Sequence, residues 1–135
     1  MRTETFFIPI MGPSLNQLYA GVHWAKRKKM ADKVHDVVAS VVGKSEQFTK
    51  PVNIIATPIA GKRHVMRDTS NYAYTYKMIE DGLVRAGLLQ DDSRRFVRDV
   101  TIKAAVEDRA GLSGMIIYIE EINDSVTQIN VSVSR

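Results

Sequence analysis

The chain has 135 residues, of which 44% are hydrophobic, and this length and composition predict one globular domain with a single core. It contains no cysteine, which excludes disulfides and thiolate metal sites, and it has no apolar run near the roughly 18 residues needed to span a membrane. The net charge of +4 favours an anionic partner. The N-terminal stretch lacks a signal-peptide pattern, so we expect a cytoplasmic protein without membrane contact.

The first half of the chain predicts two strands with a helix between them. Residues 5–11 are rich in β-branched and aromatic side chains and end at a Gly-Pro pair, which indicates a strand followed by a loop over 13–24. From residue 25 to about 42, apolar side chains recur at steps of three and four, the spacing of an amphipathic helix. A second strand is predicted over 52–59, where Pro58 indicates an edge strand or a strand end.

The second half begins with a long predicted helix over about 71–88. Its buried stripe is expected to consist of Tyr72, Tyr76, Ile79, Leu83 and Ala86. Gly87 is placed like the glycine that ends a helix and lets the chain reverse.

Strand patterns follow this helix. Residues 96–107 alternate, which predicts a half-buried strand with Val100, Ile102, Ala104 and Val106 on one face. A hairpin turn over 108–114 and a partner strand over 115–122 come next, and 126–133 is either a last short strand or a tail. These elements predict an α+β fold (mixed α/β) in the order β-α-β-α-β-β. We expect about four to five strands in one sheet, two main helices and a single domain over 1–135.

Two acidic clusters bracket the long helix. Asp68 precedes it, Asp91 and Asp92 follow it, and Lys77 lies between them. Because the ends of a long helix lie far apart, the clusters meet only if the following chain folds back along it. Oxygen ligands suit Mg²⁺, and hydrolysis of a phosphodiester needs a cation to offset negative charge. The alternatives are that Asp68 caps the helix, that Lys77 pairs with Asp81, and that Asp91 and Asp92 belong to a polar turn.

Basic residues surround these clusters and also begin the first helix. Cations at a helix N-terminus oppose its macrodipole, a cost that DNA phosphate would offset, although a merely solvated face is the alternative. The candidate DNA-binding residues are Lys26, Arg27, Lys28, Lys29, Lys62, Arg63, Arg67, Arg94, Arg95 and Arg98. The loop over 13–24 either flanks the DNA or anchors the next helix through its aromatic side chains. His64 is expected to be an exposed loop histidine rather than a metal ligand or base.

Several motifs together resemble those of the RusA-type Holliday-junction resolvases, in the branch carried by phages and prophages. They are Arg67-Asp68-x-x-Asn71, Lys77, Asp81-Gly82-Leu83, Ala86-Gly87 and Asp91-Asp92, with Pro13-Ser14-Leu15-Asn16 and His23-Trp24-Ala25-Lys26-Arg27-Lys28-Lys29 before them. The resemblance covers about residues 8–106. RusA proteins are small homodimeric, Mg²⁺-dependent endonucleases that cut four-way DNA junctions.

The resemblance implies roles for individual residues. Asp68 matches the family's first aspartate, Asn71 its asparagine, Lys77 its essential lysine, and Asp92 its late metal-binding aspartate, with Asp91 beside it. It therefore implies that Asp68, Lys77 and Asp92 are catalytic. It also implies a Mg²⁺ site, with Mn²⁺ as an alternative ion, held by Asp68, Asp92, Asp91 and Asn71.

One position departs from the family pattern. Ser70 stands where a second metal-binding aspartate is usual, and Asn71 and Lys77 are further apart than in the best-known members, a spacing that looks normal for the phage branch. A missing carboxylate weakens the expected affinity for metal and, with it, the expected activity.

The expected function is that of a hydrolase of DNA recombination and repair, a homodimeric crossover-junction endodeoxyribonuclease acting in a bacterial host cell. A nuclease for forks or flaps would share the chemistry. Two different classes of protein also fit the sequence. One is a junction-binding or branched-DNA-binding protein of the same fold with weakened or lost catalysis, and the second is a small basic protein-binding domain whose aspartates are caps and turns.

Overall fold

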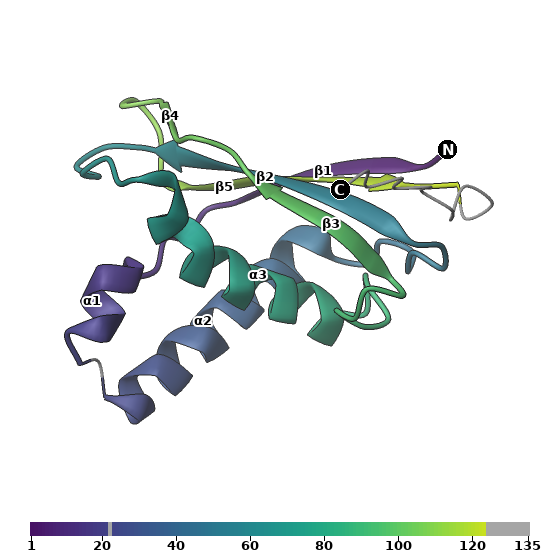
Figure 1. The fold of residues 1–135 in the computed structure, drawn as a ribbon, viewed down its shortest axis with the longest axis horizontal. Coiled ribbons are helices and arrows are strands. Elements are labelled where there is room, and N and C mark those ends of the chain that lie inside the picture. Colours follow the sequence, from purple (N-terminus) through teal and green to yellow (C-terminus); the bar gives the residue numbers. More distant parts are fainter. Residues whose placement is uncertain (22, 124–135) are drawn as a thin grey trace, which may run out of the picture.

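A computed structural model describes residues 1–21 and 23–123 of the chain. This part folds into one five-stranded sheet with two main helices packed on the same face (Figure 1). The predicted α+β fold is confirmed. The last strand or tail predicted over 126–133 lies outside the described residues. No helix of the described part has the length and apolar character required to cross a bilayer.

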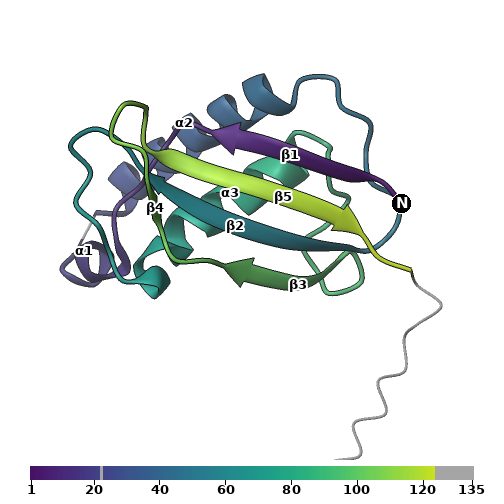
Figure 2. The same ribbon diagram turned by 90° about the horizontal axis from the view of Figure 1, so that it is seen from above.

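The sheet has the order β1-β5-β2-β3, with β4 also paired to β2 (Figure 2). The strands are β1 (Thr3–Ile8), β2 (Val52–Ala60), β3 (Val97–Ile102), β4 (Val106–Glu107) and β5 (Gly114–Glu121). β5 runs antiparallel to both β1 and β2, whereas β3 and β4 run parallel to β2. Parallel neighbours need a crossover connection, and the helix between β2 and β3 supplies it.

The helices are α1 (Leu15–Tyr19), α2 (Trp24–Val42), the 3₁₀ helix η1 (Thr69–Tyr72) and α3 (Ala73–Arg85). The predicted apolar stripes do face the core, because Val34 and Val38 of α2 and Ile79 and Leu83 of α3 are fully buried. Gly82 lies where the two helices approach, and an added Cβ there would come 3.1 Å from the Val38 side chain.

The end of α3 reverses the chain as expected. Gly87 has a φ of 83°, the left-handed conformation that glycine adopts without strain. The N–H of Leu88 donates to the carbonyl of Leu83, and the N–H of Gly87 donates to that of Val84, both at 3.0 Å. This is a Schellman motif, and the buried Leu88 and Leu89 that follow hold the returning chain against the core.

Two predictions about the strands are wrong. The alternating stretch over 96–107 forms two strands, and its Val100 and Val106 are exposed rather than part of a buried face. The expected hairpin with 115–122 is absent from the described sheet, because β5 pairs with β1 and β2 instead. This pairing places β5 between two strands, and its Met115, Ile117 and Ile119 are fully buried.

Of the two alternatives indicated by Pro58, the edge strand is wrong, since β2 is a central strand, whereas β2 does end shortly after the proline, at Ala60. The carbonyls of Ala56 and Ala60 accept from the N–H groups of Lys103 and Asp108. Pro58 has the same strand parity, so its missing N–H faces the break between β3 and β4. The proline is tolerated there because, on that side of β2, neither β3 nor β4 pairs with it, while β5 pairs with it on the other side.

The expected loop over 13–24 contains a short helix. Ser14 and Gln17 form a reciprocal capping box that starts α1. The Ser14 hydroxyl accepts from the backbone N–H of Gln17 at 3.1 Å, and the Gln17 side-chain oxygen accepts from the backbone N–H of Ser14 at 2.8 Å. The aromatic side chains of this segment do not anchor α2, because Tyr19 is 82% exposed and Trp24 is 71% exposed.

Candidate functional site

Lys77 lies at the centre of a charged cluster on α3. Its Nζ is 2.8 Å from Asp92 Oδ2, 3.1 Å from Asp81 Oδ1 and 3.3 Å from Glu80 Oε1. Asp81 and Glu80 belong to the same helix, but Asp92 arrives from the loop after Gly87. The chain therefore does fold back along α3, and one ammonium group meets three carboxylates.

The cluster favours the charged forms of Lys77 and Asp92. The hydrogen bond to Asp92 raises the pKa of Lys77, and Asp81 and Glu80 add to this effect while burial opposes it. The same hydrogen bond lowers the pKa of Asp92. Lys77 therefore stays a cation and Asp92 a carboxylate at neutral pH.

Glu80 is the buried member of the cluster and was missed in the sequence. It is 7% exposed, and the Tyr76 hydroxyl donates to its Oε2 at 2.7 Å while Lys77 holds its Oε1. Burial, followed by the hydrogen bond to Glu80, raises the pKa of Tyr76. The available signal was the spacing of four residues from Tyr76, which places this carboxylate beside the buried stripe.

The start of the α3 segment holds the other candidate residues. Asp68 occupies the N-cap position of η1, but its side chain makes no capping hydrogen bond, so the capping alternative is not borne out. Within residues 1–21 and 23–123 its carboxylate has no hydrogen bond or ion pair, and it is exposed. Asn71 Oδ1 accepts from the N–H of Asn16 at 3.3 Å and so connects η1 to α1, while Ser70 is exposed.

Asp91 and Asp92 point to different partners. Asp91 Oδ1 accepts from the N–H of Ser93 at 2.9 Å, a contact typical of the polar turn that was the alternative to a metal site. Asp92 instead belongs to the Lys77 cluster. In the described part of the chain, no group of three or more His, Asp or Glu side chains is placed to hold a metal ion. The carboxylate oxygens present are nevertheless of the type that Mg²⁺ takes.

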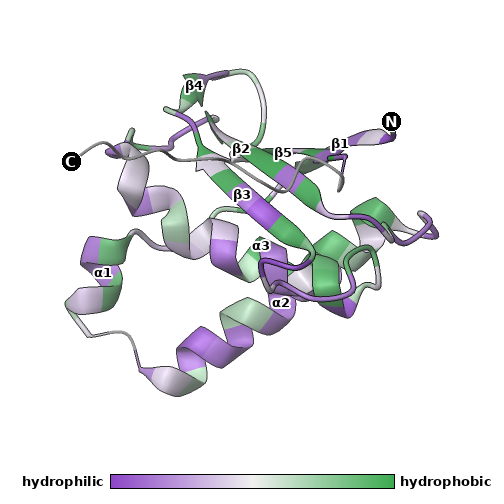
Figure 3. Ribbon diagram, turned by 45° about the vertical axis from the view of Figure 1, so that its right-hand side comes forward, coloured by the Kyte–Doolittle hydropathy of each residue, from purple (hydrophilic) through white to green (hydrophobic). Residues whose placement is uncertain are grey.

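Some of the candidate DNA-binding side chains are held by hydrogen bonds or an ion pair within the protein, and others are exposed to solvent. Arg67 Nη1 donates to the carbonyl of Gly12 at 2.9 Å, and Arg27 Nη2 donates to that of Leu18 at 3.5 Å. Lys28 Nζ pairs with Asp32 at 3.0 Å. The remaining lysines of the first turns of α2, Lys26 and Lys29, are exposed, in a region that Figure 3 shows as hydrophilic.

The other candidates lie in the loop after β2 and around the start of β3. Lys62 and Arg63 are exposed in the loop after β2, where Arg63 has a positive φ of 67°. Arg98, within β3, donates through its Nε to the carbonyl of Arg94 in the preceding loop at 3.0 Å, and the Arg95 guanidinium of that loop lies 5.6 Å from the ring centre of Phe96.

His64 is not the exposed loop histidine that was expected. Its Nε2 lies 3.0 Å from the Tyr72 hydroxyl, which also accepts from the N–H of Arg67 at 3.1 Å. Burial lowers the pKa of His64, with smaller contributions from Arg67 and Arg109. Arg109, which the sequence did not single out, donates to the carbonyls of Gly61 and His64. These contacts hold the loop that leads to Asp68.

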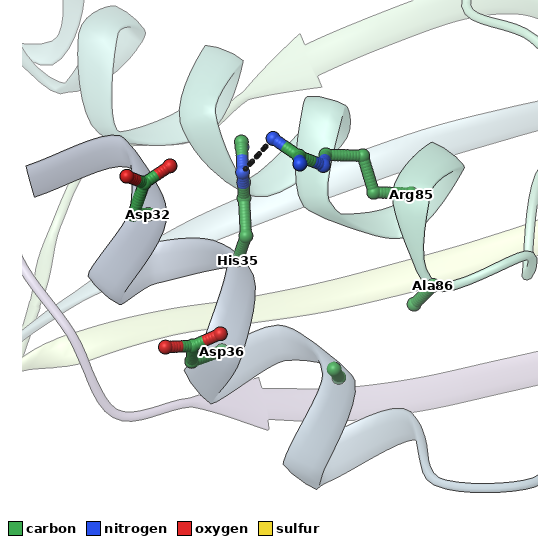
Figure 4. Close-up of a pocket in the computed structure, with 6 residues that line it drawn as sticks. Asp32, His35, Asp36, Arg85 and Ala86 are labelled. Carbon is green, nitrogen blue, oxygen red and sulfur yellow. Dashed lines mark hydrogen bonds between the residues drawn. The ribbon is translucent and has the colours of Figure 1, made fainter. Parts of the chain in front are cut away.

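A second cluster lies between α2 and α3 (Figure 4). Arg85 Nη1 is 3.0 Å from His35 Nδ1, and Asp32 and Asp36 line the same cavity of about 370 Å³. The hydrogen bond from Lys28 lowers the pKa of Asp32. This cluster was not predicted, because its members come from two helices whose contact is not visible in the sequence.

No protein-family model matches the chain, and no curated protein matches it.

Proposed function

We propose that this protein is a Mg²⁺-dependent, structure-specific DNA endonuclease that resolves four-way junctions. The observation that carries the proposal is the contact between Lys77 and Asp92, two residues that the RusA resemblance names as essential lysine and late aspartate. They are 15 residues apart in the chain, so their meeting is not a consequence of helical spacing. It supports a shared role at one site.

The donor set fits a hard cation in chemical type. Asp68 has an exposed carboxylate free to ligate, and Asp92, Asp91 and Asn71 offer further oxygen atoms. When bound, Mg²⁺ would activate water for in-line attack and stabilise the leaving 3′-oxygen. Lys77 remains protonated because of its carboxylate neighbours, so its ammonium supplies positive charge to the scissile phosphate and does not act as a base.

Exposed cations then hold the DNA arms through contacts to phosphates that do not depend on sequence. Lys26, Lys29, Lys62 and Arg63 are exposed and suited to this role. A four-way junction is cut at two symmetric places, and one chain offers one candidate site. A C₂ homodimer follows from that symmetry.

The second candidate is a branched-DNA-binding protein of the same fold with weakened catalysis. Ser70 favours it, because this residue supplies a neutral hydroxyl where the family usually has a carboxylate.

A cleavage assay on a synthetic four-way junction, with Mg²⁺ and with EDTA, tests both candidates. Cleavage that needs Mg²⁺ supports the endonuclease. Tight junction binding without cleavage at any Mg²⁺ concentration supports the second candidate. The absence of both binding and cleavage contradicts both candidates.

A further inference from the structure

A groove with an apolar floor and a lysine rim lies between α1, the segment after β1 and the first half of α2. We call it the lysine groove. Its volume is about 560 Å³, within the range of roughly 300–1,000 Å³ that small-molecule sites occupy. Its lining consists of Ile10, Met11, Gly12, Pro13, Gln17, Lys26, Lys29, Met30 and Lys33.

The rim has a charge of one sign. Lys26, Lys29 and Lys33 follow one another at steps of three and four residues, so they share one side of α2, and no acidic residue lines the groove. Within residues 1–21 and 23–123, none of the three is in an ion pair, whereas Lys28 on the same helix is paired with Asp32. Like charges at this spacing repel each other, and a bound anion would relieve that repulsion.

The floor is apolar and adaptable. Met11 and Met30 are half-buried there, and the flexible, polarisable thioether of methionine packs well against flat rings. The two helices that border the groove also carry large exposed aromatic side chains, Tyr19 at the end of α1 and Trp24 at the start of α2. Basic grooves combined with exposed aromatic side chains are typical of proteins that bind unpaired nucleotides.

The wall of the groove is fastened to the helix that carries Lys77. The N–H of Gly12 donates to Thr75 Oγ1 at 3.0 Å, and the carbonyl of Gly12 accepts from Arg67. A Cβ at Gly12 would lie 2.6 Å from Met78 Cε, so this segment packs closely against the side chains of α3. The groove is therefore held in a fixed position relative to α3.

We propose that the lysine groove binds one unpaired nucleotide of branched DNA, with the phosphate on Lys26, Lys29 and Lys33 and the base against Met11 and Met30. This inference rests on the proposed function, since it specifies how the same protein would recognise a branch point, where bases leave the stack. Contacts to phosphate alone do not distinguish paired from unpaired DNA, whereas a pocket for one base does.

The native methionines provide the test. The full chain is labelled with ¹³C at the methionine methyl groups and titrated, in EDTA, with three DNAs: a duplex with one unpaired thymidine, the same duplex fully paired, and the same duplex with an abasic residue at the unpaired position. We expect the Met11 and Met30 signals to move only with the unpaired thymidine. Met115, which is fully buried inside the sheet, is the internal control. Equal shifts with paired or abasic DNA would overturn the proposal.

Affinity measurements give the second arm. Fluorescence anisotropy in EDTA should show a preference of roughly fivefold or more for the unpaired over the paired duplex, the lower end of what one stacked base contributes. Replacing Lys26, Lys29 and Lys33 together with Ala should abolish that preference, whereas Lys44→Ala, an exposed lysine just after the other end of α2, should keep it. An unchanged preference in the triple variant, with the Met115 signal native, would contradict the proposal.

The two proposals fail in different ways. The titrations need no cleavage, so absent methionine shifts together with normal junction cleavage overturn only the nucleotide site. Selective methionine shifts without Mg²⁺-dependent cleavage support the nucleotide site and overturn only the endonuclease.

Discussion

Lys77 Nζ lies 2.8 Å from Asp92 Oδ2, although 15 residues separate them and the intervening chain ends one helix and reverses direction. The contact depends on the Schellman motif at Gly87, which returns the chain along α3. The ammonium group of the helix and the carboxylate of the loop therefore occupy one site.

Asp92→Asn should abolish Mg²⁺-dependent cleavage of a four-way junction and leave junction binding near normal. The substitution keeps the shape of the side chain but removes the charge that a hard cation needs. Cleavage is measured in Mg²⁺ and binding in EDTA. Asp99→Asn, an exposed aspartate on β3, is the matched control. Equal cleavage by the Asp92 variant and wild type would remove Asp92 from the site.

Lys77→Ala should lower the cleavage rate strongly, with little loss of fold. The loss of one well-placed charge contact in the transition state costs roughly 2–4 kcal/mol. Single-turnover cleavage and thermal unfolding are measured together. Asp81→Asn is the control, because it removes one partner of Lys77 and keeps the ammonium group. A change in unfolding alone would leave Lys77 as a residue of the helix surface.

Ser70→Asp should leave the Mg²⁺ concentration for half-maximal cleavage almost unchanged. Ser70 is exposed, and the longer separation of Asn71 from Lys77 is expected to move it away from the metal. An anionic oxygen that did reach the metal would tighten its binding. A clear shift to lower Mg²⁺ in this variant would show that a carboxylate is simply missing from the natural site.

Tyr76→Phe should lower the free energy of unfolding by about 1–3 kcal/mol, because it leaves a buried oxygen of Glu80 without its donor. Urea denaturation measures the effect. Tyr74→Phe is the matched control on the same helix, since the Tyr74 hydroxyl has no hydrogen bond within the described part of the chain. Equal stability of the two variants would show that the bond from Tyr76 to Glu80 contributes nothing.

The ion pair between Lys77 and Asp92 predicts a pH dependence of stability. The folded-state pKa of Asp92 is lowered, so its contribution is present above the unfolded value of about 3.9 and is lost as pH falls through the lowered value. The pKa of Lys77 is raised, so its contribution is present below about 10.4 and is lost as pH rises through the raised value.

Thermal unfolding of wild type and Asp92→Asn should therefore differ near pH 7 and converge as the pH falls below the lowered pKa of Asp92. The difference is expected to be small, because both side chains are partly exposed to solvent. A difference that persists unchanged in acid would contradict an electrostatic origin.

Local pattern was sufficient to predict the elements that depend on local forces. The spacing of apolar side chains predicted α2, α3 and their buried stripes. The conformational freedom of glycine predicted that α3 ends near Gly87. The basic start of α2 and the acidic residues around α3 were likewise visible as residue types. Each of these features involves neighbours within a few turns of the chain.

The tertiary structure decided which distant segments meet. An alternating strand does not specify its partner, so β5 was expected beside 96–107 and instead lies between β1 and β2. The burial of Glu80, the connection of Asn71 to Asn16 and the shape of the lysine groove depend on the same long-range packing. They arise because burying Met115, Ile117 and Ile119 selects one pairing of the strands, and that pairing fixes where each loop returns.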